Sequence, residues 1–221
     1  MTHGKMLKSK KHVLWEALVI TITIFLLGLF LGMILEGSNS IKINNLFAQS
    51  ETSLIDAMTI SKLLEDSKFD CEVIKQNNID FADRIYEEAK LLEEYEESGK
   101  LTENMKVLHK KYDLLRTLVW TNNQESLKFC NNYNLIIYLY EYNSEEINTR
   151  AINNVWSKIL LEVKESNDDV LLLPIAADQN LASLDLLMSY HKIEQFPALI
   201  INDKDILQEI DNVKDVETYL N

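Results

Sequence analysis

The most hydrophobic stretch of the chain lies close to its N-terminus. Residues Val13 to Leu35 form an apolar run with one ionisable side chain, Glu16, and about 20 apolar residues in a helix suffice to cross a bilayer. The pattern therefore predicts a transmembrane helix over residues 13–35. A cleaved signal peptide is the alternative, but the run is too long for a usual one and no A-x-A-like cleavage site follows it.

Charged residues flank this segment unequally. Glu36 follows the apolar run, whereas four lysines precede it: Lys5, Lys8, Lys10 and Lys11. Positive charges near a membrane helix favour the cytoplasmic side. We therefore expect residues 1–12 to be a cytoplasmic tail and the rest of the chain, beyond the span, to be extracytoplasmic, which makes the protein a single-pass protein of the cell membrane.

Gly28 and Gly32 form a G-x-x-x-G inside the predicted span. This spacing allows two membrane helices to approach closely, so the two glycines are candidates for membrane-helix packing in a homodimer. Ordinary use of glycine in a membrane helix is the alternative reading.

After a predicted linker over residues 36–51, helical periodicity continues as far as Cys130. A first amphipathic helix is expected over residues 52–66. Two longer series with alternating spacings of three and four follow, the pattern of a coiled-coil seam, and Gly99 interrupts them. The seam positions, most of them apolar, are Cys71, Ile74, Asn78, Phe81, Ile85, Glu88, Leu92 and Tyr95, then Met105, Leu108, Tyr112, Leu115, Val119, Asn122, Ser126 and Phe129. The pattern predicts an antiparallel helical (coiled-coil) hairpin in a helical domain over residues 52–130.

The numbering of the two series tests this hairpin. If the helices fold back about Gly99, the numbers of facing residues should add to a constant. Pairs along the two series do so, with a sum of 200: Tyr95 with Met105, Leu92 with Leu108, Ile85 with Leu115, Phe81 with Val119, and Asn78 with Asn122. The buried Asn78–Asn122 pair would fix the register.

Cys71 and Cys130 add to 201 and therefore fall at nearly the same level, at the base of the hairpin. Thiols in an extracytoplasmic segment can oxidise. Helix ends splay enough for an axis separation of about 8–10 Å to relax toward the roughly 4.4–6.8 Å between Cα atoms that a disulfide needs. We expect a Cys71–Cys130 bridge. A redox-active pair is the alternative, although neither cysteine belongs to a C-x-x-C.

The pattern changes after Cys130. Residues 135–142, 170–177 and 198–202 are rich in β-branched and other apolar side chains and predict buried strands. Helical periodicity separates them, residues 204–210 can form a hairpin with the third strand, and a closing helix follows. The element order is β-α-β-α-β-β-α over residues 133–221, so the fold class of the chain is α+β or α/β with a helical N-terminal half.

Part of this domain resembles a known family. Asp178 ends the second strand, and the runs Tyr190-His191-Lys192-Ile193 and Phe196-Pro197-Ala198-Leu199-Ile200-Ile201 follow. These residues and the element order resemble the minimal thioredoxin superfamily fold. Together with the predicted membrane helix and the disulfide-linked hairpin, this domain makes the chain look like membrane-anchored thioredoxin-like proteins of archaea. The resemblance implies that Pro197 is a cis-proline and that Tyr142, Phe196, Pro197 and Ala198 line a peptide groove.

The chain departs from active members of that family between the first strand and the first helix. Active relatives carry a C-x-x-C there, where the helix N-terminus lowers a cysteine pKa. Residues 142–149 read YNSEEINT and contain no cysteine. Dithiol chemistry at that position is therefore impossible, and Ser144 is interpreted as a helix cap.

Charge and the remaining motifs narrow the function further. The net charge is −13, and without residues 1–35 it is −16, from 18 basic and 34 acidic side chains, so binding to nucleic acid phosphates is excluded. Four scattered histidines give no zinc spacing, and no nucleotide-binding or nucleophile motif occurs. We expect no metal, no cofactor and no enzymatic activity. Glu93, Glu94, Glu96 and Glu97 at the hairpin tip predict a solvated face, with docking of a basic partner or divalent cations as the alternative.

The sequence thus favours a single-pass membrane protein with a redox-inactive, extracytoplasmic domain that binds a protein or peptide partner. One alternative is a thiol-disulfide oxidoreductase that uses Cys71 and Cys130. A second is a homo-oligomeric membrane scaffold that associates through Gly28, Gly32 and the hairpin.

Overall fold

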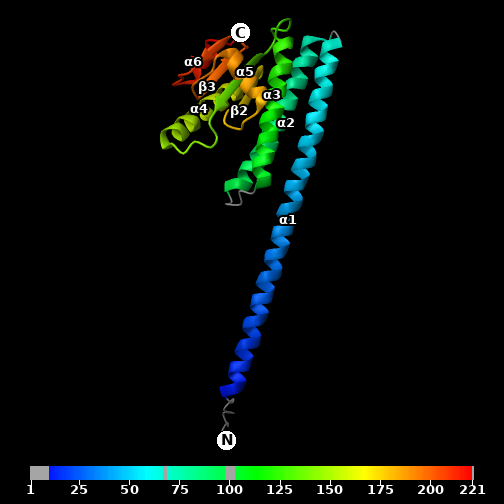
Figure 1. The fold of residues 1–221 in the computed structure, drawn as a ribbon, viewed down its shortest axis with the longest axis vertical. Coiled ribbons are helices and arrows are strands. Elements are labelled where there is room, and N and C mark those ends of the chain that lie inside the picture. Colours follow the sequence, from blue (N-terminus) through cyan, green and yellow to red (C-terminus); the bar gives the residue numbers. More distant parts are fainter. Residues whose placement is uncertain (1–9, 67–68, 98–102, 221) are drawn as a thin grey trace. The chain divides into compact units, whose positions relative to one another are not determined.

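The computed structural model describes residues 10–66, 69–97 and 103–220, with the backbone alone for residues 10–12, 34–43, 64–66, 93–97 and 104. Within these ranges the chain forms six helices and four strands (Figure 1). The helices are α1 Lys10–Asp66, α2 Cys71–Glu97, α3 Glu103–Ser126, α4 Ile147–Ser166, α5 Ala182–His191 and α6 Val213–Glu217. The strands are β1 Asn134–Tyr140, β2 Val170–Ala176, β3 Ala198–Ile201 and β4 Asp205–Leu207.

The chain divides into two compact units, Met1–Leu46 and Phe47–Asn221. In the first unit, Val13–Met33 is a helical segment with a mean hydropathy of 2.3 and no buried share. By length and composition this segment can cross a membrane, as the sequence predicts. The lysines at positions 5 and 8 lie outside the described residues, and so do the side chains of Lys10 and Lys11.

The predicted linker is helical. Residues 36–51 lie within α1, and the helix expected over residues 52–66 is the last part of the same element. A continuous helix is possible here because Gly37 and the neighbouring serines and asparagines weaken a helix only modestly. No proline stands between residues 36 and 66 to interrupt the backbone hydrogen bonds.

The helices α2 and α3 form the predicted antiparallel pair, and most of the predicted seam is buried. Ile74, Phe81, Ile85 and Leu92 of α2 are buried, and so are the α3 residues Met105, Leu108, Tyr112, Leu115 and Val119. The side chain of Tyr95 and those of the acidic tip, Glu93, Glu94, Glu96 and Glu97, lie outside the described part of the chain.

The seam moves by one residue toward the C-terminal end of α3. Asn123 is fully buried and its Oδ1 accepts a hydrogen bond from Asn78 Nδ2 at 2.8 Å. Asn122, the predicted partner, is half-buried and its Nδ2 lies 3.4 Å from the Ala57 carbonyl oxygen. An α-helix drifts by about 20° per heptad against a strict 3.5-residue repeat, so the facing position advances along a straight helix. Phe129 is 60% exposed because α3 ends at Ser126, so this residue lies in the turn after the helix and not on its seam.

The four strands form one mixed sheet in the order β2-β1-β3-β4. The strands β1 and β2 are parallel, whereas β1 with β3 and β3 with β4 are antiparallel. The helices α4 and α6 pack on one face of the sheet, where the apolar core includes Ile136, Tyr138, Trp156, Leu160, Val163, Leu199, Ile201 and Val216. The element order and the strand directions agree with the sequence prediction for residues 133–221.

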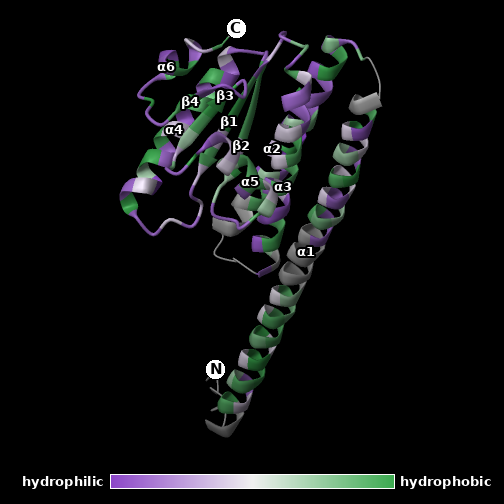
Figure 2. Cartoon of the chain, turned by 45° about the horizontal axis from the view of Figure 1, so that its top comes forward, coloured by the Kyte–Doolittle hydropathy of each residue, from purple (hydrophilic) through white to green (hydrophobic). Residues whose placement is uncertain are grey.

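The helical hairpin and the sheet are parts of one compact unit rather than two domains. Both α2 and α3 contact the edge strand β2 (Figure 2). Asp113 of α3 accepts a hydrogen bond from the backbone N–H of Ala176 at 3.2 Å. Ion pairs join Lys75 to Asp169 and Lys164 to Asp83. The predicted boundary between residues 130 and 133 therefore separates secondary-structure types, not independently packed bodies.

Candidate functional site

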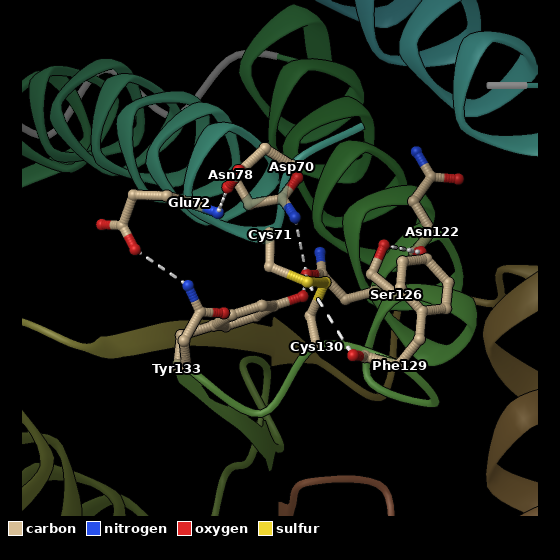
Figure 3. The surroundings of a disulfide bond; sticks show 11 residues. Asp70, Cys71, Glu72, Asn78, Asn122, Ser126, Phe129, Cys130 and Tyr133 are labelled. Atoms are coloured by element: carbon tan, nitrogen blue, oxygen red, sulfur yellow. Dashed lines mark hydrogen bonds between the residues drawn. A yellow bond between two sulfur atoms is a disulfide. The ribbon is translucent and has the colours of Figure 1, made fainter. Parts of the chain in front are cut away.

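Cys71 and Cys130 form a disulfide at the base of the hairpin (Figure 3). Cys71 is the first residue of α2, and Cys130 follows the last turn after α3. Their Cα atoms are 5.5 Å apart, inside the usual range for a bridge of about 4.4–6.8 Å. The expected disulfide is confirmed.

Polar contacts join this disulfide to the chain segment that leads into β1. Asp70 Oδ1 accepts a hydrogen bond from the backbone N–H of Glu72 at 2.8 Å, which satisfies one free donor at the start of α2. Asn132 Nδ2 in turn donates to Glu72 Oε2 at 3.0 Å. The bridge and these contacts fix the first turn of α2 to the residues just before the sheet.

A buried amide network lies about two helical turns along the hairpin from the disulfide. The Tyr133 hydroxyl donates to Asn123 Oδ1 at 2.6 Å, the same oxygen that accepts from Asn78. Burial raises the pKa of Tyr133 to about 12, so its hydroxyl stays neutral and remains a donor. This network connects α2, α3 and the start of the sheet through a single acceptor.

The loop between β1 and α4 holds no thiol and is fixed by a carboxylate. Residues 141–146 contain no cysteine. Asp178 Oδ1 accepts from the backbone N–H of Tyr142 at 3.0 Å, and its Oδ2 accepts from that of Asn143 at 2.7 Å. The N-cap of α4 is Glu146, without a side-chain hydrogen bond. The interpretation of Ser144 as the cap was wrong, because the helix begins at Ile147, two residues later than a cap at Ser144 requires.

The residues of the expected peptide groove lie at one end of the sheet. The Phe196–Pro197 peptide bond is cis, and Ala198 pairs with Leu139 near the end of β1. Pro197 and Ala198 are buried, whereas Phe196 is half-buried. Of the three, only Phe196 presents an accessible side chain.

Tyr142 turns toward the helical hairpin. Its hydroxyl lies 3.3 Å from His109 Nε2, and the two ring centroids are 4.7 Å apart. The sequence did not indicate this contact, because His109 belongs to α3 and precedes Tyr142 by 33 residues.

Asp203 forms a second polar cluster, in the turn between β3 and β4. Its Oδ1 lies 2.8 Å from Gln124 Nε2, 3.4 Å from Trp120 Nε1 and 3.0 Å from His191 Nε2. Asn202 and Asp203 both have positive φ angles, 51° and 59°, a conformation that Asn and Asp tolerate better than most residues. One carboxylate therefore joins the turn to α3 and to the end of α5.

A cavity of ≈ 380 Å³ opens where the hairpin meets the edge strand β2 and the helix α4. Its walls come from α2, α3, β1, β2 and α4, and they include Tyr86, His109, Tyr138, Asn153, Lys158 and Leu172. No sequence pattern indicates this site, since its residues come from five elements spread over about 90 positions of the chain.

In the described part of the chain, no group of three His, Cys, Asp or Glu residues is arranged to hold a metal ion. A Cβ atom added at Gly28 or Gly32 would meet nothing within 4 Å, so both positions are open along the N-terminal helix. In comparisons with known proteins, the sequence matches no family model and no curated protein, and the structure matches no solved structure.

Proposed function

We propose that this protein is a membrane-anchored, extracytoplasmic binding protein with a redox-inactive thioredoxin-like domain. The observation that carries this proposal is the Cys71–Cys130 disulfide, because it uses both cysteines of the chain at the base of the hairpin. The loop between β1 and α4, where active relatives carry their dithiol, therefore has no cysteine. The apolar segment Val13–Met33 supplies the anchor.

The sheet topology and the cis bond before Pro197 support the thioredoxin-like assignment. In this arrangement the surface next to Phe196 is the place for an extended polypeptide, which can bind by adding a strand to a sheet. The hairpin covers the β2 edge, so the short strand β4 is the edge left for such an addition. Ile206 of β4 is 41% exposed.

A photo-crosslinking experiment in native membranes tests the binding function. A photoreactive residue at Phe196 or Ile206 of the full chain should capture the same discrete polypeptide. A photoreactive residue at Tyr219, which is 40% exposed and thus comparable to Ile206, is the control and should not capture it. The proposal fails if Phe196 and Ile206 capture no polypeptide, or only those that Tyr219 captures.

Reduction of insulin by the full chain tests the redox-inactive part of the proposal. We expect no turnover above a Cys71→Ser/Cys130→Ser variant, because the disulfide uses both cysteines, Cys130 is 1% exposed and the sequence has no third cysteine. Turnover that disappears in this variant would instead assign the chain to the thiol oxidoreductases.

A further inference from the structure

The cavity beside β2 differs in charge from the rest of the protein. Lys90, Arg116 and Lys158 line it, and no aspartate or glutamate does so among the described residues. The protein as a whole carries −13, so a basic cavity is unexpected for a merely solvated surface. A low-dielectric wall strengthens the attraction of such charges for an anion.

The three cationic side chains lie at two depths in the cavity. Lys90 and Lys158 are exposed at the rim, whereas Arg116 is 7% exposed. Arg116 Nη1 lies 3.3 Å from Asp113 Oδ1, so Asp113 offsets its charge. The two lysines therefore supply the net positive charge, and an anionic group is expected at the rim rather than at the floor.

Aromatic and apolar side chains form the walls. The rings of Tyr138 and Tyr140 are stacked with centroids 5.2 Å apart, and Leu160 and Leu172 extend the apolar surface. Tyr86 adds a further ring from α2. Pockets for small molecules are mostly apolar with few polar groups and have volumes of about 300–1,000 Å³, so ≈ 380 Å³ suits a small flat molecule.

One buried acceptor in the wall has no donor. Asn153 is 9% exposed, and its Nδ2 donates to the Glu141 carbonyl oxygen at 3.0 Å. This bond fixes the orientation of the amide and leaves Asn153 Oδ1 buried without a hydrogen-bond partner. Buried acceptors are nearly always satisfied, so this oxygen indicates a place for an O–H or N–H group of a ligand.

We propose that this cavity is a binding site for a small aromatic carboxylate that carries one hydrogen-bond donor on its ring. The carboxylate lies near Lys90 and Lys158, the ring lies against Tyr138 and Tyr140, and the donor reaches Asn153 Oδ1. This site involves neither Phe196 nor β4, and the proposal does not depend on the polypeptide-binding function proposed above.

Calorimetry with three matched probes tests the site on the full chain in lipid nanodiscs, with empty nanodiscs as the blank. The compound 4-hydroxyphenylacetate has the anion, the ring and the donor, phenylacetate lacks the donor, and tyramine replaces the carboxylate by an ammonium. We expect saturable binding of 4-hydroxyphenylacetate, about two- to tenfold weaker binding of phenylacetate because one hydrogen bond is lost, and no binding of tyramine.

Variants connect the probes to the named residues. Asn153→Leu should abolish the preference for 4-hydroxyphenylacetate over phenylacetate. Lys158→Gln should weaken binding of both carboxylates by about threefold, as expected for one exposed charge. Arg150→Gln removes a positive charge from the same helix, at an exposed residue that does not line the cavity, and should change neither affinity.

Three results would each overturn the proposal. The first is the absence of saturable binding of either carboxylate. The second is binding of tyramine as tight as that of 4-hydroxyphenylacetate, because the basic rim would then not select the ligand. The third is a preference for the hydroxylated probe that persists unchanged in Asn153→Leu.

Discussion

The Cα atoms of Cys71 and Cys130 lie 5.5 Å apart although 59 positions separate them in the sequence. The bridge closes the base of the antiparallel pair α2 and α3, and about two turns further along the hairpin a hydrogen bond joins Asn78 to Asn123. A covalent link and a buried polar link thus hold the same register.

Removing the disulfide should destabilise the C-terminal unit. In the chain-entropy model, a closed loop of this length contributes about 4 kcal/mol. Cys71→Ala/Cys130→Ala should therefore unfold at a markedly lower denaturant concentration than the wild type. The measurement is urea unfolding followed by tryptophan fluorescence, with and without a reductant. The reductant should lower the stability of the wild type and leave the variant unchanged; an equal effect on both would contradict a structural role of the bridge.

Glu88 makes the hairpin sensitive to pH. It is 4% exposed, its Oε1 accepts a hydrogen bond from Gln49 Nε2, and burial raises its pKa above the ordinary value of 4.5. The folded state therefore holds this proton more tightly than the unfolded state. The corresponding stability is fully present below the unfolded pKa and is lost as pH rises through the raised folded pKa.

Glu88→Gln should remove this loss. We expect the variant to be at least as stable as the wild type at pH 7 and to show a flatter decline of unfolding free energy with rising pH above about 4.3. Glu87→Gln, at an exposed neighbouring position, is the matched control and should keep the slope of the wild type. A slope in Glu88→Gln that equals that of the wild type would show that Glu88 does not carry the effect.

Asp113 holds α3 against the sheet. It is buried, it pairs with Arg116 at 3.3 Å, and it accepts a hydrogen bond from the backbone N–H of Ala176. Asp113→Asn leaves the Arg116 guanidinium buried without a counter-charge, so we expect a loss of about 3–5 kcal/mol in unfolding free energy. The double variant Asp113→Asn/Arg116→Met should recover part of this loss in urea titrations. A double variant less stable than Asp113→Asn would contradict the coupling.

Asp203 should stabilise the turn between β3 and β4. Asp203→Ala removes the acceptor for Gln124 and Trp120 and places alanine at a positive φ angle, so we expect a loss of about 1–3 kcal/mol. Amide hydrogen exchange should become faster in β4. Asp205→Ala, an exposed neighbour, serves as the control, and equal acceleration in both variants would argue against a specific role of Asp203.

Periodicity predicted the hairpin well because each interface position of an antiparallel helix pair is fixed by local spacing. The constant sum places Leu92 opposite Leu108 and also brings Cys71 close to Cys130. The sum fails at Asn122, because a small drift per heptad accumulates along a helix and brings Asn123 to the interface instead. The spacing of apolar residues alone does not reveal such a drift.

The contacts between elements that are distant in the chain could not be predicted from the sequence. Tyr142 was predicted to line a peptide groove, and the contact of its ring with His109 of α3 was not predicted. The Lys75–Asp169 and Lys164–Asp83 ion pairs join the hairpin to the rest of the unit. The sequence does not reveal these pairs, because any charged surface residue is an equally good candidate for such a partner. The cavity around Asn153 follows from this docking and was therefore also missed.

The central claim is that Cys71 and Cys130 are joined permanently and serve the fold. Differential alkylation and non-reducing mass spectrometry of the full chain, isolated from membranes after acid quenching, test it most directly. We predict one cross-linked peptide pair containing both cysteines and no mixed disulfide with another polypeptide. Two free thiols, or a mixed disulfide trapped at either cysteine, would contradict the claim.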